Sequence, residues 1–94
     1  MIGRRLPDLR DGEPGPPMEP GDYQKDYDGL WWICLPVLTT QGGKICTALP
    51  EKHTPSVPGW KVVENDDGTI TVTPSINYQG VWHGWLTKGE WISC

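Results

Sequence analysis

The sequence predicts an all-β fold, a small antiparallel β-sandwich or barrel that follows an extended N-terminal arm rich in proline and glycine. No window of residues 29–94 repeats apolar residues at the 3.6-residue period of a helix longer than one turn. Short runs rich in Trp, Ile, Val and Thr are instead separated by glycine-containing turns. The 94 residues also include 12 glycines and 10 prolines, and both residue types interrupt regular elements.

The composition divides the chain into an arm, residues 1–28, and a domain, residues 29–94. Five of the prolines lie in the arm, whereas all six tryptophans lie in the domain. A segment with so few large apolar residues cannot offset the entropy of ordering its backbone. We therefore expect the arm to lie outside the core and to become ordered on a partner.

Three hairpins are predicted where two apolar runs flank turn residues. The paired runs are 30–38 with 44–49, 60–64 with 69–73, and 81–86 with 90–93. The second hairpin has the clearest signal, because its turn reads Asn-Asp-Asp-Gly and the alternation after the turn places Ile70 and Val72 on one buried face. Pro74 should interrupt or bulge the strand that continues through Ile76.

The third hairpin carries a pair of tryptophans. A three-residue loop at 87–89 would pair Leu86 with Glu90, which places Trp85 opposite Trp91. Six tryptophans exceed what the centre of so small a domain can hold, so we expect some of them at the surface. The residues predicted to fill the core are Trp32, Leu35, Val62, Ile70, Val72, Ile76 and Trp82.

Charge and hydropathy exclude several functional classes. The net charge is −4 and all three arginines lie in the first ten residues, so we expect no nucleic-acid partner. The longest apolar run, 30–38, is far shorter than the roughly 20 residues that span a bilayer, and the first residues lack the apolar region of a signal peptide. We therefore expect no membrane partner and no secretion through a signal peptide.

The residues that can carry chemistry are few. A zinc site is conceivable if Cys34, Cys46, His53 and His83 converge, although no Cys-x-x-Cys pair supports it. Cys34 and Cys46 lie on facing strands of the first hairpin, where they would form either a disulfide or, in a reducing compartment, free thiols. No nucleophile, base and oxyanion hole can be recognised together, so the sequence predicts neither an enzyme nor a cofactor.

One family resemblance extends over most of the domain, and it is carried by Thr71–Ile76, Trp82–Leu86, Gly89, Trp32–Pro36 and Gly59–Trp60. The sequence resembles a family of small, mostly phage-encoded proteins known only as a domain of unknown function. The resemblance implies a compact β-domain and a phage source, with no established activity. The family's bacterial relatives look zinc-binding, with a cysteine cluster near the position of Cys34 and a histidine near that of His83.

These observations predict a non-enzymatic, phage-encoded protein-binding module. The first hypothesis is a virion accessory protein, a capsid decoration or tail-associated protein whose arm orders on a neighbouring subunit. The alternative is a soluble inhibitor of a host defence or regulatory protein, and a zinc-binding accessory module is a third hypothesis. The expected location is the virion or the host cytoplasm, and homo-oligomerisation is left open. The residues predicted to bind the partner are Ile2, Leu6, Leu9, Tyr23, Tyr27, Trp31, Trp85 and Trp91.

Overall fold

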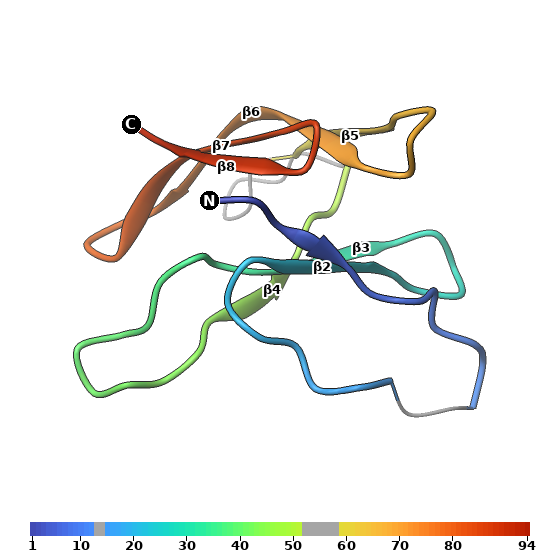
Figure 1. Ribbon diagram of the computed structural model, residues 1–94, viewed down its shortest axis with the longest axis horizontal. Coiled ribbons are helices and arrows are strands. Elements are labelled where there is room, and N and C mark those ends of the chain that lie inside the picture. The colour runs from blue at the N-terminus through green and yellow to red at the C-terminus, as the bar shows by residue number, and fades with distance from the viewer. Residues whose placement is uncertain (13–14, 52–58) are drawn as a thin grey trace.

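The computed structural model describes residues 1–12, 15–51 and 59–94, and these residues form a β-sandwich of two four-stranded sheets (Figure 1). The predicted all-β fold is therefore confirmed, and no helix occurs in the described part of the chain. It follows that these ranges contain no helix long and apolar enough to cross a membrane.

The first sheet has the strand order β1-β2-β3-β4 and is antiparallel except for the β1–β2 pair. Its last two strands are the predicted first hairpin, and Cys34 lies directly opposite Cys46 across it. The parallel β1–β2 pair joins residues near the chain start to a strand that follows the proline-rich stretch. The bounds are β1 (Arg4–Arg5), β2 (Asp22–Lys25), β3 (Trp31–Cys34) and β4 (Cys46–Ala48).

The second sheet is antiparallel throughout, in the order β5-β6-β7-β8. The predicted second hairpin forms β5 and the start of β6, and its turn is closed by a 2.7 Å hydrogen bond from Asn65 N–H to the Thr69 carbonyl. As predicted, Pro74 lies in an irregularity, because the β6–β7 register shifts between Val72 and Ile76. The bounds are β5 (Lys61–Glu64), β6 (Ile70–Tyr78), β7 (Trp82–Thr87) and β8 (Glu90–Ser93).

The core lies between the two sheets and receives side chains from both. The predicted core residues Leu35, Ile70, Val72 and Ile76 are buried there, and Val62 and Trp82 pack against them. The expectation for Trp32 is wrong, because successive side chains on a strand point to opposite faces and Trp31 takes the inward position. Trp32 is only half-buried, and its indole N–H donates to Asp26 at 3.1 Å. Among the described residues, the buried cluster consists of Tyr23, Trp31, Ile33, Leu35, Leu49, Ile70, Val72, Ile76, Leu86 and Trp91.

The N-terminal segment differs from the expected arm, because parts of it are built into the sandwich. Tyr23 on β2 is 1% exposed and belongs to the core. Leu6, which directly follows β1, is also buried, and its N–H donates to the Tyr23 carbonyl at 2.9 Å. The first residues also reach the other sheet, where Ile2 forms an antiparallel bridge with Glu90 (Figure 1). Long-range pairing therefore supplies the apolar burial that the segment lacks by itself.

The third hairpin forms with a register one residue away from the predicted one. Thr87, not Leu86, pairs with Glu90, because the turn consists of Lys88 and Gly89, which both have positive φ angles of 47° and 74°. A shift of one residue moves every side chain of one strand to the other face. Trp91 consequently points into the core, whereas Trp85 is paired with Ile92 on the outside of the sheet.

An ion-pair cluster joins the edges of the two sheets. Arg5 bonds to both Glu64 and Asp8 at 3.0 Å, and its guanidinium lies 5.0 Å from the ring centre of Trp31. Lys25 reaches the other oxygen of Glu64 at 3.3 Å. Hydrogen bonds from Arg5 and Lys25 lower the pKa of Glu64 from its ordinary value of 4.5.

Replacing Glu64 with glutamine is expected to cause a small, pH-dependent loss of stability. Because the folded protein holds the pKa of Glu64 below its ordinary value, the stabilisation is present above pH 4.5 and is lost as the pH falls through the folded-state pKa. Glu64 is partly exposed, so the loss at pH 7 should not exceed about 1 kcal/mol, or a few degrees in melting temperature. Thermal melts of the wild type and of Glu64→Gln at pH 7 and pH 3 measure this loss of stability. An equal loss at pH 7 and pH 3 would contradict an ionic origin of the stabilisation. The control is Glu90→Gln, because Glu90 forms no ion pair with the described residues.

Candidate functional site

The candidate site lies on the hairpin formed by β6 and β7. The two strands are joined by a tight turn in which Val81 N–H donates to the Tyr78 carbonyl at 2.9 Å and Gly80 has a φ of 80°. Beyond the turn, Asn77 pairs with His83 and Ile76 pairs with Gly84. This pairing brings together two sequence motifs that lie on either side of the turn.

A serine and a histidine meet on the outer face of this hairpin. His83 Nε2 lies 3.2 Å from Ser75 Oγ, which is hydrogen-bond distance, and the pair is accessible to solvent. Ser75 precedes buried Ile76 and His83 precedes buried Gly84, so the alternation of both strands turns the two side chains away from the core. A neutral imidazole with an unprotonated Nε2 can accept the hydroxyl proton in this geometry.

Gly84, the neighbour of His83 on β7, lies where there is no room for a side chain. A Cβ at this position would collide with the Ile92 carbonyl oxygen and with the ring of Trp82. The absent side chain therefore leaves room for the Trp82 ring, which also packs edge-on against Trp91 with ring centres 5.4 Å apart. The inward side of β7, which carries His83 on its outer side, is thus packed against Trp91 of β8.

Ser75 lies in the irregular part of β6. The register gives Ser75 no partner on β5 or β7, since the β5 pairing ends at Thr73 and the β7 pairing resumes at Ile76. Proline at 74 has no N–H to donate, which suits a break in the ladder. Ser75 therefore lies outside the regular register of β6 with either neighbouring strand.

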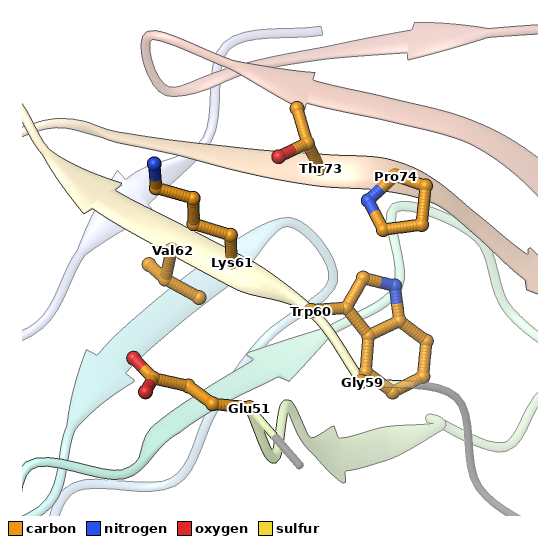
Figure 2. A pocket seen from close by; sticks show the side chains of 7 residues that line it. All are labelled: Glu51, Gly59, Trp60, Lys61, Val62, Thr73 and Pro74. Atoms are coloured by element: carbon orange, nitrogen blue, oxygen red, sulfur yellow. The ribbon is translucent and has the colours of Figure 1, made fainter. Parts of the chain in front are cut away.

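A cavity of about 580 Å³ opens immediately beside this irregularity (Figure 2). Thr73 and Pro74 form its wall on β6, so it begins one residue before Ser75. In Figure 2 the indole of Trp60 lies beneath Pro74, with its nitrogen on the side of the proline. That indole N–H is buried and has no hydrogen-bond partner among the described residues. The remaining lining residues are Glu51, Gly59, Lys61 and Val62.

Three of the four candidate metal ligands lie in the described residues, and these three are not brought together. Cys34 and Cys46 are free thiols that face each other in the first sheet, whereas His83 lies on the second sheet. Burial raises the pKa of Cys34 to about 12, and the neighbouring Cys46 adds to the shift. His53 lies outside the described residues. Within them, no three His, Cys, Asp or Glu side chains gather as a metal site.

The residues predicted to bind a partner separate into buried and exposed groups. The buried group is fixed in the protein's own interior, as shown by Trp91, whose indole N–H donates to the Gly21 carbonyl at 2.9 Å. Three members are exposed, namely Ile2 at 74%, Tyr27 at 64% and Trp85 at 38%, and Leu9 is half-buried. The buried members are Leu6, Tyr23, Trp31 and Trp91.

A serine hydroxyl within hydrogen-bond reach of a histidine is the nucleophile and base part of the arrangement in hydrolases that use a serine nucleophile. Residues 11–94 match the family BubE, described as the serine protease of a bacterial ubiquitination-like system, and the chain belongs to this family. No curated protein and no solved structure matches the chain.

The family assignment corrects the predicted function. The phage-encoded family of unknown function is the wrong assignment, because the match is to a bacterial protease family. The non-enzymatic module is also wrong in each of its three forms, namely virion accessory protein, host-protein inhibitor and zinc-binding accessory module, because the family is one of enzymes.

Sequence reasoning did not single out Ser75 as a functional residue. A serine after a proline is common in turns, and its partner histidine lies eight positions away, so no fixed motif marks the pair. A signal was nevertheless present, because Ser75 and His83 lie in the two motifs that carried the family resemblance. Pairing these motifs as one hairpin would have placed the two side chains on the same face.

Proposed function

We propose that this protein is a serine protease in which Ser75 is the nucleophile and His83 is the general base. The observation that carries the proposal is the 3.2 Å separation between Ser75 Oγ and His83 Nε2. The family assignment supports it, because the family is described as a serine protease. The bond cleaved is an amide bond of a polypeptide.

The reaction follows from the two groups. His83 Nε2 accepts the hydroxyl proton while Ser75 Oγ attacks the substrate carbonyl carbon, and the carbonyl oxygen becomes an oxyanion. The protonated imidazole then gives its proton to the leaving amine, and an acyl ester remains on Ser75. Water then attacks this ester while the imidazole accepts its proton, the bond between the acyl carbon and Ser75 Oγ breaks, and the imidazolium returns the proton to Oγ as the carboxylic acid leaves.

Two further groups, a backbone N–H and a side-chain amide, have positions that suit supporting roles. The backbone N–H of Ser75 is the candidate oxyanion donor, because the register gives this residue no partner strand on either side. Asn77 is the direct cross-strand partner of His83 and lies on the same face. Its amide is the candidate group that orients the imidazole.

Covalent labelling of the nucleophile tests this proposal and needs no natural substrate. A fluorophosphonate probe phosphonylates an activated serine, so the intact protein should gain one probe mass, and peptide mapping should place it on Ser75. Ser75→Ala should abolish the adduct. Ser93→Ala is the matched control, because Ser93 is an exposed serine of the same sheet, and it should label normally.

Two results would overturn the proposal. One is probe attachment to another serine while Ser75 stays unmodified. The other is full labelling of the His83→Ala variant, because a serine without a general base has no reason to react faster than an ordinary hydroxyl.

A further inference from the structure

The outer face of the second sheet carries an apolar strip that starts beside the Ser75–His83 pair. Trp85 follows Gly84 on β7, and its ring centre lies 6.2 Å from that of His83. Trp85 pairs directly with Ile92 on β8, and both side chains are exposed, at 38% and 44%. Large apolar side chains at the surface beside a reactive pair need an explanation other than core packing.

The N-terminal residues extend the strip by one more strand. Ile2 bridges Glu90 of β8, so cross-strand alternation places it on the same face as Ile92, and it is 74% exposed. Ile2 and Ile92 are diagonal neighbours, within reach of each other's side chains. We name Trp85, Ile92 and Ile2 the apolar strip. It runs across the strands, from the reactive pair to the sheet edge.

We propose that the apolar strip binds apolar side chains of the substrate polypeptide on one side of the scissile bond. This inference rests on the proposed protease function. The strip is continuous with the Ser75–His83 pair, and the cavity beside Pro74 lies toward the opposite edge of the sheet, at β5. The apolar preference should therefore apply to one flank of the scissile bond only.

The strand spacing sets the length of the bound segment. Ile2 lies three strand spacings from β6, which carries Ser75, and strands are about 4.8 Å apart, so the strip ends roughly 14 Å from the nucleophile when measured across the strands. An extended polypeptide covers that distance in about four residues. The strip should consequently select apolar residues within about four positions of the scissile bond.

The first measurement is the cleavage of a mixed peptide library, read by mass spectrometry. The wild-type protein should enrich Leu, Ile, Val, Phe and Met within four positions on one flank of the cleaved bond. Trp85→Ala, Ile92→Ser and Ile2→Ser should each reduce this enrichment. Val63→Ala is the matched control, because Val63 has the same 44% exposure as Ile92 and lies on the opposite edge strand.

The second measurement separates flank binding from chemistry. For a peptide chosen from the library, Trp85→Ala should raise KM about tenfold and leave kcat nearly unchanged, because the contact is made equally in the ground and transition states. Hydrolysis of p-nitrophenyl acetate, which has no flanking residues, should not change. Thermal melts of each variant establish that it is folded.

The outcomes distinguish the inference from the proposed function. If Ser75→Ala stops cleavage while the three strip variants cleave every peptide as the wild type does, the strip is not a substrate site and the protease assignment stands. If Ser75→Ala still cleaves, both fail. A loss of p-nitrophenyl acetate hydrolysis in Trp85→Ala equal to its loss with peptides would also overturn the inference, because Trp85 would then act on the reactive pair.

Discussion

Replacing His83 with alanine is expected to lower the rate of peptide cleavage by about 10³-fold. Positioned general bases contribute roughly 10²–10⁴-fold to such reactions. The loss should appear in kcat, because the imidazole acts on the hydroxyl proton only as the bond to the substrate forms. Steady-state kinetics with a peptide taken from the library would measure it.

The control for this variant is the double replacement of Ser75 and His83. Groups that act as a unit are strongly non-additive, so the double variant should be no slower than the slower single variant. His83 is exposed, and its alanine variant should melt within a degree or two of the wild type. If the fold-loss in rate of the double variant equalled the product of the two single losses, the two residues would not act as a unit.

Replacing Trp91 with alanine is expected to destabilise the fold by about 3–5 kcal/mol, the cost typical of removing a buried tryptophan. Trp91 is 4% exposed, packs against Trp82 and donates its indole N–H to Gly21. The substitution leaves a cavity and removes one of the two hydrogen bonds that the Gly21 carbonyl accepts, the other being from the Arg4 N–H at 3.4 Å. Small domains have total stabilities of about 5–15 kcal/mol, so much of the stability would be lost.

Trp85→Ala is the matched variant, since it removes the same side chain from the neighbouring strand. Trp85 is 38% exposed and points away from the core, so its loss should cost far less, about 1 kcal/mol or below. Urea unfolding of both variants, followed by circular dichroism, measures the difference. Equal destabilisation would mean that the two side chains do not lie on opposite faces.

Local sequence signals predicted the β5–β6 hairpin well. Its turn, Asn65–Gly68, and the alternation around Ile70 and Val72 specify structure within a few residues of each other. The β7–β8 turn was predicted one residue too long. That small error placed Trp85 and Trp91 on the same face, whereas they lie on opposite faces, because side chains in a strand alternate with a period of two.

Pairings between segments that are distant in the chain leave no signal in the local sequence. Nothing within residues 1–28 marks Tyr23 as a core residue, because its burial depends on strands from elsewhere in the chain. The site was missed for a related reason. Ser75 and His83 were noticed only as parts of separate motifs, and their chemistry arises from the pairing of β6 with β7.

The edge contact of Ile2 with Glu90 also bears on the order in which the molecule assembles. Ser75 and His83 are brought together by a tight hairpin, which closes on a microsecond timescale. The bridge between Ile2 and Glu90 joins almost opposite ends of the chain, and closing so long a loop has a larger entropic cost. The reactive pair should therefore form early in folding, while the outer end of the substrate strip is completed last, when the N-terminal segment adds to β8.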